Sequence, residues 1–124
     1  MREQQWQALQ KVAQEETDRL LRELPPPIRV QLETMPIVFE KVPSSDLVAD
    51  GLDPDLMGLF VGDDYACEGA DPIPPEILLF LGNILDEAEG DMDRYRQEVR
   101  TTLLHELGHY LGLDEEGLFD RGLE

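Results

Sequence analysis

Residues 105–109 read His-Glu-Leu-Gly-His and contain both histidines of this 124-residue chain. Side chains four residues apart lie one above the other on the same face of an α-helix. At this spacing, His105 and His109 can bind one metal ion together, and the carboxylate of Glu106 stands beside it. The sequence therefore predicts a metal site on a helix, with the two histidines as ligands.

The residues around this motif predict a helix at residues 92–111. Asp91 is suited to cap its start, and Gly112 is suited to the left-handed conformation that ends many helices. Aromatic and aliphatic residues recur at helical spacing and are expected to face the core: Tyr95, Val99, Leu103, Leu107 and Tyr110. Because the histidines lie beside this stripe, we expect them at the border between the core and a cleft.

Two further helical regions are expected upstream. Apolar residues recur at helical spacing through residues 3–24, which predicts an amphipathic helix that covers the core with one face. Prolines 25–27 end it, and residues 28–33 are expected to add one or two helical turns. A short helical stretch is also expected at residues 83–89.

Three segments have strand composition, namely residues 36–42, 56–61 and 77–81. Gly58, in the second of these, indicates a β-bulge or a close backbone approach. Residues 48–55 hold too many Asp, Gly and Pro residues for regular structure, and residues 62–75 read as an acidic surface loop. We expect a compact α+β fold in one domain, residues 1–124, with a small mixed sheet of about three strands packed against the N-terminal helix and the long metal-binding helix.

The charge of the chain limits its partners. The net charge is -18, from 28 acidic and 10 basic residues, so nucleic acids and anionic membranes would be repelled.

Cys67 is the only cysteine, and its polar surroundings favour a free thiol in a reducing compartment. The first residues are polar and glutamine-rich, unlike a signal peptide, so we expect a cytoplasmic protein.

The metal site needs a third protein ligand. A catalytic zinc ion takes three protein ligands and keeps one open position. In the extended pattern H-E-x-x-H-x-x-G-x-x-ligand, Gly112 turns the chain back and the ligand position is Glu115. A shift of one residue in this turn would present Asp114 instead. No methionine follows the motif, which excludes the methionine turn of metzincins.

Zinc held in this way would lower the pKa of a bound water and polarise a substrate carbonyl, and Glu106 would be the general base. By their chemistry alone, Tyr65, Tyr95 and Tyr110 are candidates to stabilise an oxyanion, although each also suits packing. The strand at residues 77–81 could align an extended peptide by edge pairing, whereas the alternative is that its side chains pack in the core.

The order of these elements, the apolar run Ile77-Leu78-Leu79-Phe80 and the stretch from Val99 to Glu115 resemble the small bacterial zincin-like metallopeptidases, or minimal zincins. The likeness runs from about Glu15 onward and is strongest from Ile77 to Glu116. It implies a zinc site at His105 and His109 on the last long helix, with Glu106 as base. The family pattern usually has an aspartate three residues after the glycine, where this chain has Glu115.

Two functions follow from this resemblance. The first is a zinc-dependent peptidase acting on a peptide or protein substrate. The second is a non-catalytic metal-binding or regulatory module that retains the fold. Glu106 favours the first, because a structural metal site has no need of a base. An active protease in the cytoplasm would need a shielded cleft, and the loop at residues 62–75 is a candidate shield.

Overall fold

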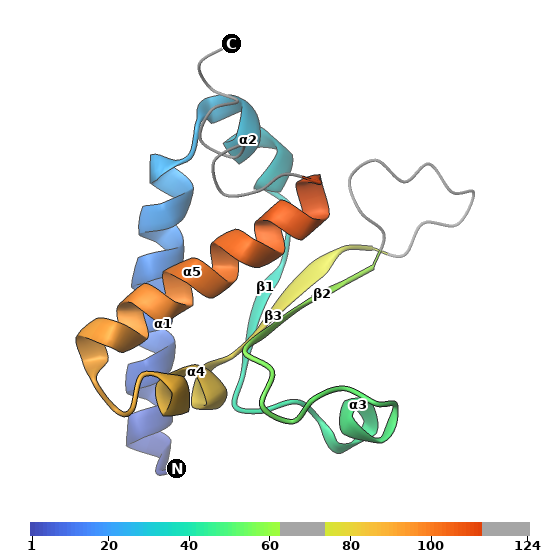
Figure 1. The fold of residues 1–124 in the computed structure, drawn as a ribbon. Helices are drawn as coiled ribbons and strands as arrows, with labels where there is room; N and C mark the ends of the chain where they lie inside the picture. The colour runs from blue at the N-terminus through green and yellow to red at the C-terminus, as the bar shows by residue number, and fades with distance from the viewer. Residues whose placement is uncertain (63–73, 113–124) are drawn as a thin grey trace.

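The computed structural model of the chain describes residues 1–62 and 74–112. The predictions made for Tyr65, Cys67, Asp114, Glu115 and nearly all of the 62–75 loop therefore lie outside the described residues. Within them the elements follow in this order: α1 (Glu3–Glu23), α2 (Pro26–Leu32), β1 (Ile37–Glu40), α3 (Ser45–Ala49), β2 (Gly58–Val61), β3 (Glu76–Phe80), α4 (Leu81–Glu87) and α5 (Met92–Leu111) (Figure 1). No helix among the described residues is long and apolar enough to span a bilayer.

The three strands form one small mixed sheet in the order β1-β3-β2. β1 pairs parallel with β3, and β2 pairs antiparallel with it. The predicted α+β fold with a small mixed sheet is confirmed. The prediction that the strand at residues 77–81 aligns a peptide at its edge is wrong, because β3 is the central strand and has a neighbour on each side. The alternative for this strand, packing in the core, holds for Ile77 and Leu79, which are fully buried. Its central position could not be predicted, because strand pairing depends on residues distant in the sequence.

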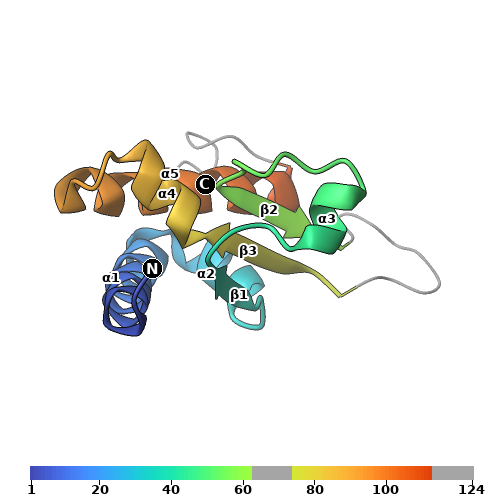
Figure 2. The same cartoon turned by 90° about the horizontal axis from the view of Figure 1, so that it is seen from below.

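Helix α5 covers one face of this sheet. Ile77 and Leu79 of β3 are fully buried, and their cross-strand neighbours Phe39 and Phe60 pack against the same core. α5 crosses the sheet beside β2 and β3, and α1 lies against α5 (Figures 1 and 2). The resulting hydrophobic core draws residues from α1, α2, β3, α4 and α5.

Helix α5 spans the predicted residues. Asp91 caps its start, since the Oδ1 atom accepts a hydrogen bond from the backbone N–H of Arg94 at 3.0 Å. Gly112 ends it with φ 69° and ψ 30°, the left-handed conformation that a residue with a Cβ atom adopts at a cost. All five residues of the predicted core stripe are buried. Local signals were sufficient here because both caps and the periodicity lie within one segment.

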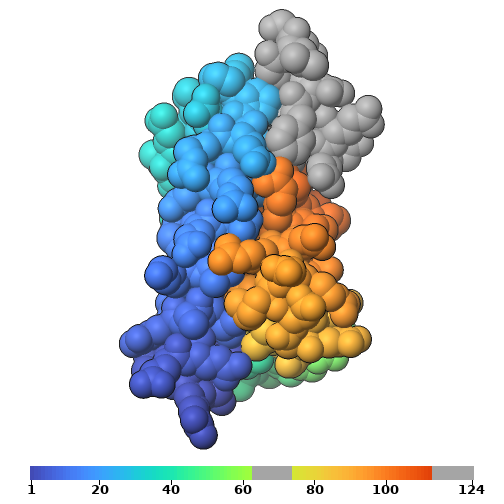
Figure 3. Space-filling view, turned by 90° about the vertical axis from the view of Figure 1, so that its left-hand side faces the viewer, coloured from blue at the N-terminus to red at the C-terminus, as the bar shows by residue number. Residues whose placement is uncertain are grey.

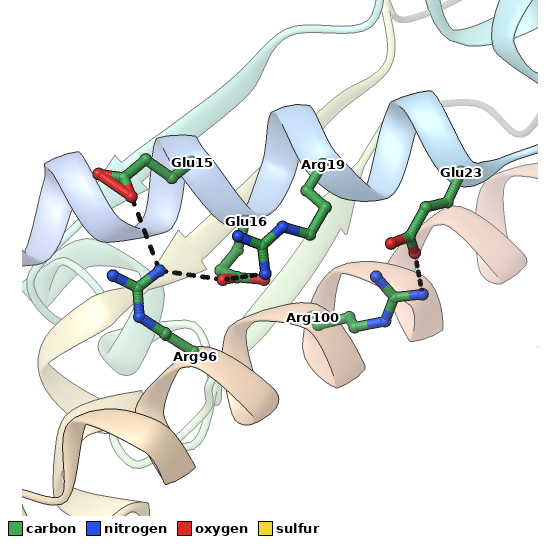
Figure 4. Close-up of polar contacts among 6 residues, drawn as sticks. All are labelled: Glu15, Glu16, Arg19, Glu23, Arg96 and Arg100. Carbon is green, nitrogen blue, oxygen red and sulfur yellow. Dashed lines mark hydrogen bonds and ion pairs between the residues drawn. The ribbon is translucent and has the colours of Figure 1, made fainter.

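Polar contacts join α1 to α5, which lie side by side in Figure 3. The hydroxyl of Tyr95 donates to the carbonyl of Leu9 at 2.8 Å, and burial raises the pKa of this phenol far above its usual value. Arg96 contacts the buried carboxylate of Glu16 at 3.0 Å, and Arg100 pairs with Glu23 (Figure 4). α1 is therefore held by directional contacts as well as by its apolar face.

The segment between β1 and β2 differs from the prediction. Residues 48–55 were expected to be irregular, but Val48 and Ala49 belong to helix α3. Ser44 caps this helix, since its Oγ accepts from the N–H of Leu47 at 3.2 Å. The capping signal was present in the sequence, but α3 is short and buries no residue, so no apolar periodicity accompanied it.

Candidate metal centre

The two histidines project from one exposed face of α5. The ring centroids of His105 and His109 are 4.4 Å apart, and their planes are inclined by 62°. One ligand atom from each of His105, Glu106 and His109 lies within 4.8 Å of the others. The predicted juxtaposition of these three residues is present. Their positions differ in one respect, since the histidines are exposed and Glu106 is buried at 6% relative exposure.

The position of Glu106 depends on Gly58. A Cβ atom at Gly58 would lie 2.6 Å from Cγ2 of Thr102 and 3.2 Å from Cγ of Glu106, so β2 can approach α5 this closely only without a side chain there. The register between β2 and β3 is uninterrupted through this residue, so Gly58 marks a close approach and not a bulge. The other side of the carboxylate faces His109, with Oε2 3.4 Å from Nδ1.

A cleft of about 550 Å³ opens beside these residues. One wall is α5, and the other is β2 with the segment that leads into it. The lining is mostly aliphatic or aromatic on the second wall, whereas the helix contributes the polar groups. The lining residues are Leu52, Leu56, Met57, Gly58, Leu59, Phe60, Glu98, Thr101, Thr102, His105, Glu106 and His109.

These donors suit a divalent transition metal. Two imidazoles on adjacent turns of a helix can converge on one ion, and their exposure leaves room for a further ligand and a substrate. Glu106 is close enough to be a ligand by distance alone. It differs from the histidines in burial, because its side chain lies against Gly58 whereas both imidazoles are exposed.

The chain contains a recognised family pattern over most of its length. A family model for zincin-like metallopeptidases matches residues 32–123, which include α5 with both histidines and Glu106. This chain belongs to the zincin-like metallopeptidases. A comparison with curated proteins finds no match. The match to the zincin-like family begins at Leu32 and not near Glu15, so α1 lies outside it.

The tyrosines predicted as oxyanion donors have other positions. Tyr95 is near the start of α5, and its hydroxyl is bonded to Leu9, so that prediction is wrong for Tyr95 and the packing alternative holds. The ring of Tyr110 packs against Phe60 with centroids 5.5 Å apart, and it is not among the residues that line the cleft. The described residues therefore provide no tyrosine for this role in the cleft.

Glu98 in the cleft and Asn83 behind its apolar wall were not predicted from the sequence. Glu98 precedes His105 by seven residues, or about two helical turns, so it shares the histidine face of α5. Asn83 donates two hydrogen bonds through Nδ2, to the carbonyls of Pro54 at 2.7 Å and Leu56 at 2.8 Å. These bonds fix the segment that forms the apolar wall. The helical spacing of Glu98 was a usable signal, whereas the partners of Asn83 lie 29 and 27 residues away.

Proposed function

We propose that this protein is a zinc-dependent metallopeptidase in which Glu106 is the general base. One observation carries the proposal: a buried carboxylate lies next to two exposed imidazoles at the wall of a cleft. A site that only binds metal has no use for such a carboxylate, which costs free energy to bury. Membership of the zincin-like metallopeptidases supports the same reaction class.

His105 and His109 would hold the zinc ion, and Glu115 or Asp114, outside the described residues, would complete the ligand set. When bound, zinc supplies a Lewis acid that polarises the substrate carbonyl and makes water more acidic. Each imidazole would bind the metal through one ring nitrogen, and that nitrogen must carry no proton. Their T-shaped arrangement at 4.4 Å keeps the two rings on the same side of α5.

Glu106 performs the proton transfers. Its carboxylate accepts a proton from the attacking water and then delivers that proton to the leaving amine. Gly58 lies against the side chain on one side, while Nδ1 of His109 lies 3.4 Å from Oε2 on the other. A base held in this way loses little conformational freedom when substrate binds.

The strand beside the site suits an extended peptide. Among the described strands, β2 pairs with β3 only, so its other edge carries backbone groups that a substrate strand can pair with. β2 also forms one wall of the cleft next to Glu106. The edge-pairing role that the sequence suggested for the strand at residues 77–81 is thus assigned to β2 in this proposal.

Glu106→Gln tests the proposed function. The amide has the same shape as the carboxylate but cannot accept a proton, so we expect kcat/KM to fall roughly a thousandfold while one zinc per chain is retained. The measurement combines elemental analysis with a peptide-library digest read by mass spectrometry. Glu40→Gln is the matched control, because Glu40 is exposed on β1 and not part of the cleft.

The alternative function, a non-catalytic metal-binding module, predicts a different result. Zinc-loaded wild-type protein would then leave every peptide of the library intact. Turnover that persists unchanged in Glu106→Gln would instead remove Glu106 from the mechanism while leaving the enzyme assignment in place.

A further inference from the structure

The cleft extends from the metal-binding residues toward the start of α5. Gly58 lies against Thr102 and Glu106, and Phe60 lies against Tyr110, so β2 runs in the same direction as the helix. The residues before Gly58 therefore lie beside the earlier turns of α5. The cleft lining agrees, because it includes Leu52 and Leu56 on one wall and residues as early as Glu98 on the other.

The wall before β2 carries apolar side chains that the core does not use. Leu52 and Leu56 are only half-buried, and neither belongs to the hydrophobic core nor packs against it. Asn83 holds the backbone here by bonding to the carbonyl of Leu56. Two leucines fixed at the wall of a cleft form a preformed surface for another apolar side chain.

Glu98 is an acidic residue of the cleft that has no partner among the described residues. It is half-buried at the cleft wall, and within residues 1–62 and 74–112 its carboxylate has no hydrogen-bond or ion-pair partner. The basic side chains of α5 that form ion pairs point elsewhere: Arg94 pairs with Glu89, and Arg96 and Arg100 pair with α1. A partly desolvated carboxylate without a partner attracts a cation brought by a ligand.

The spacing of these features matches an extended peptide. Glu98 and His105 are seven residues apart, which corresponds to about 10 Å along the helix axis. An extended chain advances about 3.3 Å per residue, so this distance spans about three residues. Leu52 and Leu56 line the same cleft as Glu98 and His105.

We infer that Glu98 is a specificity-determining residue for peptides that carry a large aliphatic side chain next to the scissile bond and a Lys or Arg about three residues further along. The inference rests on the proposed function, because the scissile bond is placed at the histidines. The net charge of -18 acts in the same direction, since it draws basic peptides toward the protein and repels acidic ones.

A competition digest tests the role of Glu98. The probe is a pool of synthetic peptides with Leu or Ser on either side of a central bond, and with Lys, Ala or Glu three residues from it on either side. We expect zinc-loaded wild-type protein to cleave Lys peptides roughly tenfold faster than Glu peptides, on one side of the bond. Glu98→Gln should bring this ratio close to the ratio on the other side of the bond, where only the net charge acts, and Glu98→Lys should lower it further. Glu40→Gln, with the same charge change on β1, should keep the wild-type ratio.

Leu56→Ala tests the contribution of the apolar wall. Leu56→Ala should reduce the preference for Leu over Ser severalfold and leave the preference for Lys unchanged, since the two contacts are separate. A difference between the two sides of the bond that persists undiminished in Glu98→Gln would overturn the inference, as would equal cleavage of Lys and Glu peptides by the wild type.

A binding measurement separates this inference from the proposed function. Fluorescein-labelled Lys and Glu peptides of the same series are titrated with wild-type, Glu98→Gln and Glu40→Gln protein, and fluorescence anisotropy is recorded. Binding that favours the Lys peptide and depends on Glu98, without any cleavage, supports the peptide specificity of the cleft and contradicts the peptidase. Cleavage without charge preference supports the peptidase and overturns the role of Glu98.

Discussion

Opposite faces of α5 are built differently. Arg96 and Arg100 point toward α1 and are paired with its glutamates (Figure 4). Glu98, His105 and His109 line the cleft on the other side. The α1-facing side satisfies its charges within the chain. On the cleft side, within the described residues, the carboxylate of Glu98 is unpaired and both imidazoles are exposed. The difference indicates that one face stabilises the helix and the other is available to metal and ligand.

His105→Ala is the variant with the largest expected effect, and it acts on the cleft face alone. Loss of one imidazole should weaken zinc affinity on the order of a thousandfold, because a metal site loses much of its binding free energy with each ligand. The free energy of unfolding of the metal-free protein should stay within about 0.5 kcal/mol of wild type, since His105 is exposed. Zinc titration with a competing chelator and chemical denaturation measure the two quantities.

Arg100→Ala is the control for His105→Ala on the opposite face of the same helix. Its ion pair with Glu23 is partly exposed, so its removal should cost less than about 1 kcal/mol and leave zinc affinity unchanged. Equal loss of zinc in both variants would mean that the two faces are not independent.

Gly58→Ala has the next largest expected effect, because it acts where the cleft face meets the sheet. The new methyl group would lie 2.6 Å from Cγ2 of Thr102, so β2 and α5 must separate and Glu106 must shift. We expect kcat/KM to fall by up to about a hundredfold, since displacements near 1 Å have such effects on catalysis. Peptide turnover at saturating zinc is the measurement.

A second substitution shows whether this clash is the cause. Thr102→Ser removes Cγ2, so Gly58→Ala combined with Thr102→Ser should recover most of the lost activity. Activity that stays low in the double variant would show that Gly58 matters for another reason, such as backbone conformation.

Arg96→Ala has the smallest expected effect of the three and acts on the α1-facing side alone. It leaves the carboxylate of Glu16, whose side chain is only 5% exposed, with Arg19 at 3.4 Å as its remaining partner. We expect a loss of about 2 kcal/mol in the free energy of unfolding, measured by urea denaturation, with unchanged zinc content. Arg94→Ala is the control, because its partner Glu89 is exposed and the pair should contribute almost nothing. Similar losses in both variants would contradict a special role for the buried carboxylate.

The sequence predicted features that depend on neighbouring residues better than those that depend on distant ones. The bounds of α5 were predicted correctly because Asp91, Gly112 and the core stripe are all local signals. The central position of β3 was not, because a strand's neighbours depend on how the whole chain folds. The pairing of Arg96 with Glu16 spans 80 residues, and nothing in either helix indicates its partner.

The same distinction applies to the candidate site. The proximity of His105, Glu106 and His109 was predicted, because it follows from helix geometry. The apolar wall was not predicted, because it forms only when Asn83 fixes a segment nearly 30 residues earlier in the chain. The spacing of Glu98 placed it on the histidine face of α5, but that this face lines a cleft became clear only with the wall in place.

The contribution of α1 separates the family signature from the unit that folds. The zincin-like match begins at Leu32, yet α1 supplies Leu9, Ala13 and Leu20 to the core. A chain reduced to the matched residues would expose the apolar side of α5 to water and leave the Tyr95 hydroxyl without its acceptor. The family match therefore covers the metal-binding motif but not all of the core on which α5 packs. Substitutions in the core face of α1, far from the histidines, would act on the metal centre by destabilising α5.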